Sequence, residues 1–328
     1  MGRAIPNIED QIRTSFQLLE GNKIIGDMLN ATKLEKIIND VLINFTNNVV
    51  ASEKDFINKL ESSDDNAKLA LNLLTSFLLT FSSRNATRDR LHIFTTNYDR
   101  FIEYTCDNAC IKILDRFFGK IQPTYQETLP NIDYYYKTPD TNNEFRYAEG
   151  VIRFTKIHGS IDWSCKGNKI IQSCLPFGCD DFTSKLDDLQ NNLMIYLNSM
   201  KSIETAYYPY SQLFRDFSSA ICRQNSLLFV YGYGFGDSHI NKILIEMLQI
   251  PSTHIVIASY QIDDRLKNFL RQINMDQITL LCGPEIVALD KLVTNYLPIS
   301  AIDRITEVVA ELIKKGKQQV ILHLIMIM

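Results

Sequence analysis

Three short stretches of this sequence contain residue types that could carry chemistry. Asn97 and Asp99 follow a short apolar and β-branched segment, and a lone histidine, His158, follows a second such segment and precedes Gly159. A histidine in a cleft could act as a general base, because its pKa lies near working pH. Taken alone, the asparagine and aspartate are more typical of ordinary helix caps, and the histidine of a satisfied structural residue.

The third stretch, Leu227–Asn241, has glycines at 232, 234 and 236, and Asp237 follows them. An apolar run before the glycines predicts a buried strand, and apolar residues at helical spacing after Asp237 predict an amphipathic helix. A strand that passes through a glycine-rich turn into a helix brings backbone N–H groups close to a nucleotide in α/β folds. A tight turn without a ligand is the alternative.

The elements that would position these stretches alternate between strands and helices from residue 91 onward. The segments predicted as strands are 91–96, 151–163, 227–231, 254–258 and 278–281. The segments predicted as helices are 101–105, 210–220, 237–248, 263–273, 285–296 and 301–314. This alternation predicts an α/β fold with a Rossmann-like, doubly wound parallel sheet. Ligands of such sheets bind beyond the carboxyl ends of the strands, which is where Asn97 would lie.

We interpret the chain as a single domain, 1–328, that adds other segments to this sheet. Its parts are a helical region (7–85), a sheet part carrying Asn97 and His158 (86–164), an insertion (165–206) and a nucleotide-binding sheet half (207–315). In the N-terminal part, apolar residues at helical spacing predict three helices, and Asn30 and Ser62–Asp65 are the expected boundaries between them.

The added segments carry weaker patterns. Residues 110–150 are rich in tyrosine, proline and asparagine, so we expect an irregular excursion there. Leucines between 186 and 196 suggest one helix in the second insertion. The apolar tail Val320–Met328 is too short to cross a membrane, and we expect a packed terminus or an interface segment.

The composition is that of a globular protein, with 45% hydrophobic and 22% charged residues. The net charge of −4 argues against a general nucleic-acid-binding surface. No apolar run approaches the roughly 20 residues of a membrane span, and the start lacks a signal-peptide core, so we expect a cytoplasmic protein. The seven cysteines are an odd number without paired spacing, which favours reduced thiols and gives no reason to expect zinc.

In their order and spacing, the three stretches closely resemble the sirtuin-like family, in its bacterial branch that degrades NAD in antiphage defence. The residues that carry the resemblance are Thr95-Thr96-Asn97-Tyr98-Asp99, His158-Gly159-Ser160 and Gly232–Asn241. The sequence after the third stretch is similar to the sirtuin subunit that pairs with a HerA-type ATPase. The resemblance covers roughly residues 91–298.

The resemblance implies roles for particular residues. Asn97 would hold the nicotinamide-side ribose or orient a water molecule at its anomeric carbon, and His158 would accept a proton from a ribose hydroxyl. Breaking the nicotinamide–ribose bond builds oxocarbenium character, so charge stabilisation, a placed nucleophile and a base all help. The residues expected to bind NAD are Thr95, Thr96, Asp99, Gly159, Gly232, Gly234, Asp237 and His239.

Two departures from the family pattern shape the functional hypotheses. The phosphate-cradling Gly-Ala-Gly-x-Ser loop does not occur in the sequence, so either the N-terminus is truncated or the first strand and its loop are missing. The paired Cys-x-x-Cys zinc ligands of protein-deacylating sirtuins are also absent from the sequence. We therefore expect an NAD⁺ glycohydrolase that uses NAD as its substrate and contains no zinc.

The alternatives are a catalytically silent subunit that binds NAD or ADP-ribose or serves as a scaffold, and an NAD-dependent protein deacylase. The partners implied by the resemblance are a hexameric HerA-type ATPase and further copies of the same chain. DNA would be contacted only indirectly through the ATPase, and no membrane would be contacted.

Overall fold

A computed structural model describes residues 8–83, 89–127, 132–137, 145–148, 150–166, 169–180, 193–195, 208–298 and 323–327. Its centre is a seven-stranded sheet in which every neighbouring pair of strands is parallel. In spatial order the strands are β13 (Ile278–Cys282), β12 (His254–Ser259), β11 (Ser226–Tyr231), β14 (His323–Ile327), β1 (His92–Thr95), β7 (Val151–Lys156) and β2 (Lys112–Leu114). The predicted Rossmann-like α/β fold is confirmed.

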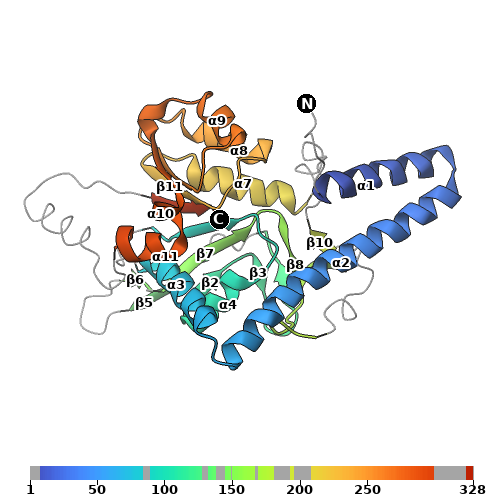
Figure 1. Cartoon of the computed structure of the whole chain (residues 1–328), viewed down its shortest axis with the longest axis horizontal. Helices are drawn as coiled ribbons and strands as arrows, with labels where there is room; N and C mark the ends of the chain where they lie inside the picture. Colours follow the sequence, from blue (N-terminus) through green and yellow to red (C-terminus); the bar gives the residue numbers. More distant parts are fainter. Residues whose placement is uncertain are drawn as a thin grey trace, which may run out of the picture.

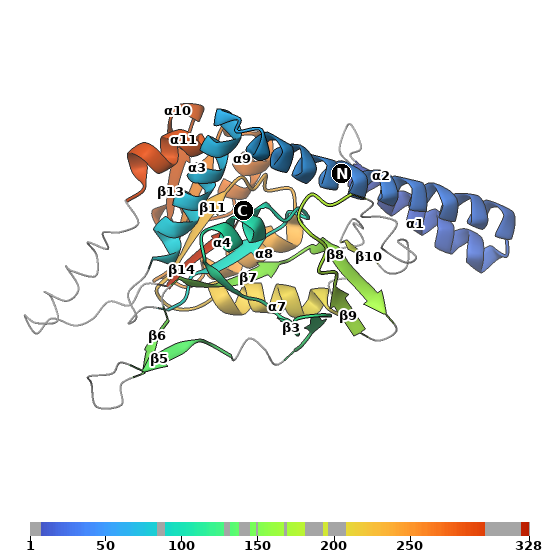
Figure 2. The same ribbon diagram turned by 90° about the horizontal axis from the view of Figure 1, so that it is seen from below.

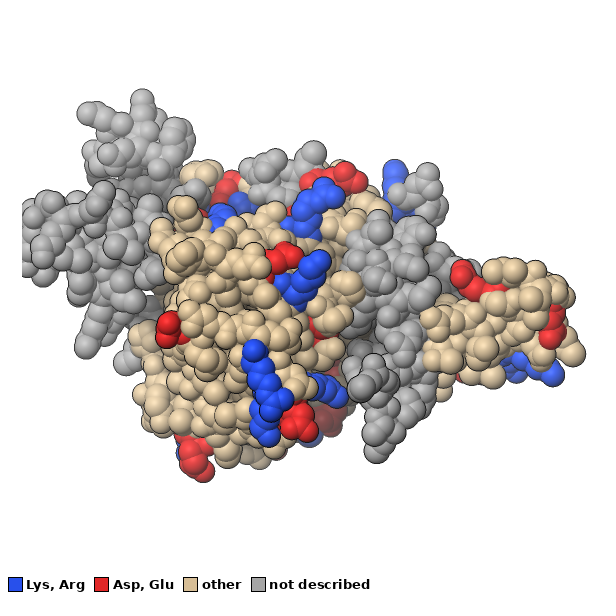
Figure 3. Space-filling model, turned by 90° about the horizontal axis from the view of Figure 1, so that it is seen from above, with Lys and Arg blue, Asp and Glu red and all other residues tan. Residues whose placement is uncertain are grey.

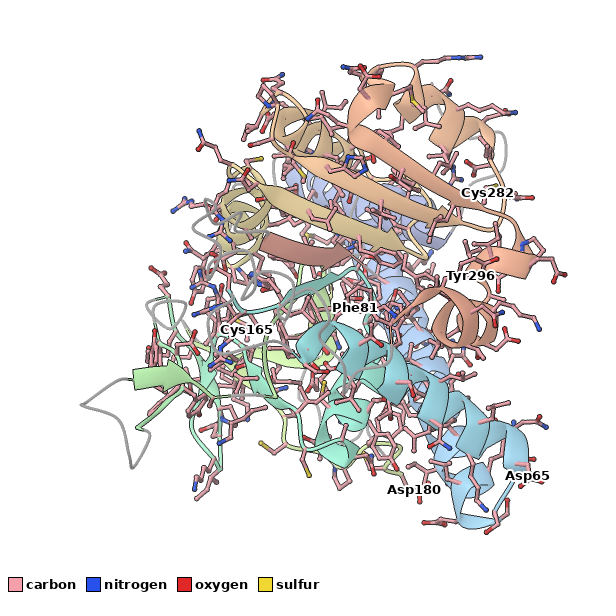
Figure 4. The ribbon with its side chains drawn as sticks, turned by 90° about the vertical axis from the view of Figure 1, so that its left-hand side faces the viewer. Asp65, Phe81, Cys165, Asp180, Cys282 and Tyr296 are labelled. Atoms are coloured by element: carbon pink, nitrogen blue, oxygen red, sulfur yellow. The ribbon has the colours of Figure 1, made fainter. Side chains whose placement is uncertain are left out.

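Helices cover both faces of this sheet because side chains along each strand alternate between two apolar cores (Figure 1). One face is covered by α7 (Tyr210–Ile221), α8 (Ser238–Met247) and α9 (Asp264–Leu270). The other is covered by α3 (Asp65–Ser82), α4 (Phe101–Asn108), α10 (Pro284–Val287), α11 (Leu289–Lys291) and the π-helical turn η4 (Leu292–Tyr296). In β1, Phe94 belongs to the first core and Ile93 to the second. Figure 4 shows α3 running from Asp65, at its outer end, to Phe81 against the sheet.

The strand β14 fills the central position of the sheet, between β11 and β1. Its backbone pairs with both neighbours, so that Ile327 lies in register with Phe94 on one side and Val230 on the other. The expected packed terminus is therefore a strand of the main sheet. The helix expected at 301–314 lies outside the described residues.

The N-terminal part forms three helices, as expected: α1 (Ile8–Ile25), α2 (Met28–Glu61) and α3. The first boundary is not at Asn30 but at Gly26, whose φ of +79° ends α1, and at Asp27, whose carboxylate accepts the N–H of Asn30 and caps α2. The boundary at Ser62–Asp65 is confirmed. The hairpin of α1 and α2 projects from the body (Figure 2).

A second, antiparallel sheet, which the sequence did not indicate, joins short strands of the two insertions to β8 (Gly159–Lys166). Its order is β10 (Leu193–Ile195), β8, β9 (Lys169–Gln172), β4 (Thr124–Tyr125) and β3 (Phe117–Phe118). The prediction of a single strand at 151–163 is wrong, because the chain turns at residues 157 and 158 and enters this second sheet after β7 ends at Lys156. A separate pair, β5 (Tyr135–Lys137) and β6 (Phe145–Tyr147), is also antiparallel. The short 3-10 turn η3 (Met275–Gln277) precedes β13. The helix suggested near 186–196 is wrong at 193–195, where β10 pairs with β8, and its other residues lie outside the described ranges.

Candidate active site

The three sequence stretches meet at the carboxyl edge of the parallel sheet. Thr95 and Lys156 pair in register at the ends of β1 and β7. Asn97 lies two residues after Thr95, and His158 lies two residues after Lys156. Because β1 and β7 are neighbouring strands, both residues follow the same edge of the sheet. The glycine-rich turn begins after Tyr231, the last residue of β11. The edge predicted to bind a ligand therefore gathers all three stretches.

A buried contact joins the second stretch to the third. The imidazole Nε2 of His158 lies 3.1 Å from a carboxylate oxygen of Asp237. Both side chains are almost fully buried. The other carboxylate oxygen of Asp237 accepts the backbone N–H groups of His239, at 2.9 Å, and Ile240, at 3.4 Å, and so caps α8. Asp237 thus orients the histidine and fixes the helix that follows, a role the sequence did not suggest.

Aromatic rings surround the histidine. The ring of Tyr98 lies 6.4 Å from that of His158, and the ring of Phe214 lies 6.3 Å from it. Phe214 also meets the ring of His239 edge-on at 6.2 Å. This apolar setting strengthens the electrostatic contact between His158 and Asp237 relative to the same contact in water.

The glycine-rich turn is open above its backbone and braced below it. A Cβ added at Gly232 or Gly234 would meet no atom within 4 Å. Beneath the turn, the hydroxyl of Tyr233 lies 3.1 Å from the backbone oxygen of Asp237 and 2.9 Å from the side-chain oxygen of Asn241. Phe235, with a φ of +50°, buries its ring in the core. The open side can admit a ligand, and the braced side holds the turn's shape.

The first stretch forms a compact turn between β1 and α4. The Thr95 hydroxyl accepts the backbone N–H of Asn97 at 3.1 Å, and Thr95 is buried. The carboxylate of Asp99 accepts the N–H of Phe101 at 3.2 Å, at the start of α4. The Asn97 side chain is exposed, while Thr96 and Asp99 are half-buried. Thr95 thus stabilises the turn from inside, and Asn97 is the residue the turn presents outward.

Lys156 holds this turn from behind. Its ammonium donates to the backbone oxygens of Tyr98 and Asp99 and to a carboxylate oxygen of Glu103 on α4, the last at 2.7 Å. The Lys156 side chain is buried. Burial raises the pKa of Glu103 to about 7, although the Lys156 ammonium opposes that rise. Lys156 therefore connects the strand leading to His158 with the turn carrying Asn97.

A second buried cation anchors the same turn to the N-terminal hairpin. The Arg100 guanidinium donates to both carboxylate oxygens of Glu53 on α2, at 2.6 and 3.2 Å, and to the backbone oxygen of Leu175 at 2.7 Å. Glu53 is fully buried. Its carboxylate also accepts the N–H of Gly178 at 3.2 Å. One helix residue therefore fixes both the start of α4 and the loop after β9.

The sequence predicted which edge of the sheet carries the site, but it did not predict the buried charged residues that hold the site in place. Of the remaining predicted residues, Gly159 begins β8 and His239 is half-buried in the first turn of α8. Lys156, Arg100 and Glu53 were not predicted. A lysine inside an otherwise buried strand could have indicated the first of these. Nothing in the sequence marks Glu53 among the many charged residues of its helix.

No group of three His, Cys, Asp or Glu side chains suited to a metal occurs among the described residues. The expectation that the chain binds no zinc stays a prediction. The cysteines are free thiols, and Figure 4 shows Cys165 and Cys282 in separate parts of the molecule. In the described part of the chain, no helix is long and apolar enough to cross a membrane.

Comparison with protein families identifies the fold. Residues 91–278 match the family model of the SIR2-like domain, which is more than half of the chain. This protein belongs to the SIR2-like family. SIR2-like domains bind NAD, and family members are NAD-dependent enzymes. The matched range contains all three stretches of the candidate site. A search of the curated proteins found no match for the chain.

Proposed function

We propose that this SIR2-like protein is an NAD⁺ glycohydrolase, which uses water to split NAD⁺ into nicotinamide and ADP-ribose. The observation that supports this best is the buried contact between His158 and Asp237 at the sheet edge that also carries the exposed Asn97. A base with a carboxylate partner and an outward-facing amide are groups that such a hydrolysis needs.

In the proposed reaction, the bond between the nicotinamide nitrogen and the anomeric carbon breaks, and its electron pair stays on the nitrogen. A water oxygen bonds to the anomeric carbon and releases one proton. Asn97 orients that water or holds the nicotinamide-side ribose. His158 accepts a proton from a ribose hydroxyl, and the Asp237 carboxylate stabilises the imidazolium that results. The ribose oxygen regains its proton from the attacking water, and the proton on His158 then passes to solvent, so one proton is released in each turnover.

The open glycine turn fits the other half of the substrate. Because a Cβ at Gly232 or Gly234 would meet nothing within 4 Å, the backbone there leaves space for the adenosine half of NAD. Thr96, Asp99, Gly159 and His239 are proposed to complete the binding surface. NAD supplies the scissile bond, and this chain supplies the groups that hold it and move the proton.

We further propose that a HerA-type ATPase is the partner and that NAD depletion serves antiphage defence. Both parts rest on the resemblance of the sequence. Co-purification of the two proteins after co-expression tests the partnership. Survival of infected bacterial cultures with wild type and with His158→Ala tests the defence role.

The enzymatic proposal is tested by measuring nicotinamide release from NAD, with and without the ATPase. Asn97→Ala and His158→Ala are each expected to lower the rate by about 100-fold or more. His254→Ala is the matched control. His254 begins β12 and contacts Thr279 at the opposite edge of the same sheet, so its loss should leave the rate unchanged.

Two other results would replace the proposal. If the wild-type chain and its partner bind ADP-ribose in calorimetry but leave NAD intact, the protein is a binding subunit. If NAD is consumed only when an acyl-lysine peptide is present, the protein is a deacylase.

A further inference from the structure

The α1–α2 hairpin carries several strongly exposed apolar side chains. They are Leu18 (54% exposed), Ile24 (84%), Ile25 (76%), Met28 (60%), Leu29 (69%) and Ile37 (52%). Figure 3 shows the hairpin projecting from the body with few charged side chains on the face turned to the viewer. Soluble monomers rarely gather so much apolar surface on one projecting element.

Helical spacing turns part of this set to one flank of the hairpin. The two helices pack against each other through buried residues that include Leu19 on α1 and Ile38 on α2. Leu18 directly precedes Leu19, and Ile37 directly precedes Ile38, so each is rotated by about 100° in the same sense from the packed face. Because the helices are antiparallel, equal rotations bring both side chains to the same flank. Ile25, one heptad after Leu18, joins them.

The α2 side of that flank carries a pattern that is symmetric about its centre. The exposed residues Asn30, Lys33, Ile37, Asp40 and Asn44 follow at spacings of three and four, which keeps them on one face of the helix. When two such helices cross antiparallel at Ile37, the two isoleucines meet. Lys33 of one copy then lies beside Asp40 of the other, and Asn30 lies opposite Asn44.

We propose that this flank is a self-association surface, on which two copies of the chain pack as an antiparallel four-helix bundle around a two-fold axis at Ile37. A two-fold contact requires a surface that is complementary to itself, and the Asn–Lys–Ile–Asp–Asn stripe has that property. Neither Lys33 nor Asp40 has an ion pair with another described residue.

The size of the flank suits a dimer. Over the length of α1 it measures about 27 Å by 20 Å, from the rise and diameter of two helices. That footprint is of the same order as the 800 Å² that each partner contributes to a standard interface.

The contact also reaches the candidate active site. Further along α2 lies Glu53, which holds Arg100 at the start of α4. Self-association fixes α2 outside the body of the protein, and the buried ion pair fixes the same helix inside it. The dimer therefore steadies the element behind the turn that carries Asn97.

Sedimentation of the full-length chain tests the proposal. The wild type is expected to form a dimer, and Ile37→Asp to raise its dissociation constant by at least tenfold. Ile121→Asp is the matched control, because Ile121 is 94% exposed but lies between β3 and β4, away from the hairpin. Circular dichroism checks that all variants keep the wild-type helix content.

A charge exchange tests the register. Lys33→Glu and Asp40→Lys should each weaken the dimer, and the double variant should recover it because the opposite charges again face each other. A monomeric wild type, a dimer insensitive to Ile37→Asp, or a double variant that fails to recover would overturn the proposal. A monomeric wild type that binds the ATPase or phospholipid vesicles through Ile37 would also overturn it, because the flank would then serve another partner.

Discussion

The two halves of the candidate active site are held in place by different forces. The glycine-rich half rests on neutral contacts, in which the Tyr233 hydroxyl, the Asn241 amide and the buried Phe235 ring brace the turn. The half that carries Asn97 rests on buried charges, in which Lys156 and the Arg100–Glu53 pair hold the turn from behind. The His158–Asp237 contact lies where the halves meet.

The two halves should therefore respond differently to a change of charge. The glycine-rich half should be little affected, whereas the half that carries Asn97 depends on its buried charges. Neutral hydrogen bonds and apolar packing are individually modest and respond little to pH. A buried ion pair is costly to break, because removing one partner leaves the other charge desolvated and unpaired. The Asn97 half should therefore fail first under single charge substitutions and under changes of pH.

The largest effect is expected from Glu53→Gln. It leaves Arg100 buried without its carboxylate, so the free energy of unfolding should fall by about 3–5 kcal/mol. The matched control is Lys54→Met, at the next residue of the same helix. It breaks an exposed ion pair with Asp180 and should lower the free energy of unfolding by less than about 1 kcal/mol. Urea denaturation measures both. Equal losses in the two variants would remove the special role of the buried pair.

The next effect is a dependence of stability on pH through Glu103. Burial raises its pKa from 4.5 to about 7, so the folded protein keeps a proton that the unfolded chain has released. The resulting stability is present below pH 4.5 and is lost as the pH rises through about 7, with a total of about 3 kcal/mol.

The check is urea denaturation at several pH values between about 4.5 and 7, the two pKa values given for Glu103. Glu103→Gln should flatten the decline, whereas Glu285→Gln, at an exposed position, should keep it. A decline of the same slope in all three proteins would assign it to other groups.

The sequence predicted the local parts of this fold well because they follow short-range rules. Alternating apolar strands and helical periodicity gave the Rossmann-like sheet, and turn residues placed Asn97 and His158 at strand ends. The first helix boundary differs from the predicted Asn30, because Gly26 supplies the left-handed turn and Asp27 supplies the cap.

Pairings between distant residues could not be predicted in this way. His158 and Asp237 are separated by 79 positions, so only the folded sheet shows that they touch. β14 is a short apolar run whose place between β1 and β11 depends on strands far away in the sequence. Glu53 has the appearance of a solvated helix residue until Arg100 is folded against it.

The contact between the halves can be tested with Asp237→Asn. Asparagine keeps the helix cap but removes the charge that faces His158, so turnover of NAD should fall by about tenfold or more, about 1.4 kcal/mol. Asp263→Asn is the matched control, because Asp263 caps α9 through the N–H of Leu266 at 2.9 Å and faces no histidine. Rates that fall equally would point to a general loss of stability.

The smallest effect is expected in the neutral half, from Gly232→Ala. Nothing within 4 Å obstructs a Cβ there, so only the backbone φ of +69° is strained, at about 1 kcal/mol of unfolding free energy. Gly234→Ala shares the open surroundings, and its φ lies outside the left-handed region, so its stability should stay at the wild-type value. Thermal denaturation distinguishes the two, and equal melting temperatures would contradict the assignment of strain to Gly232.

Phe235 sets the timescale on which the glycine-rich turn can move. Residues other than glycine rarely adopt the left-handed backbone conformation found at Phe235. The turn keeps this conformation because the Phe235 ring packs against Phe269, with ring centres 4.9 Å apart. The turn therefore cannot reverse its backbone at Phe235 without withdrawing an aromatic ring from the packed interior beneath α8 and α9. The amide hydrogens of the turn should therefore exchange with solvent only as often as this opening occurs, and more slowly than those of an unrestrained loop.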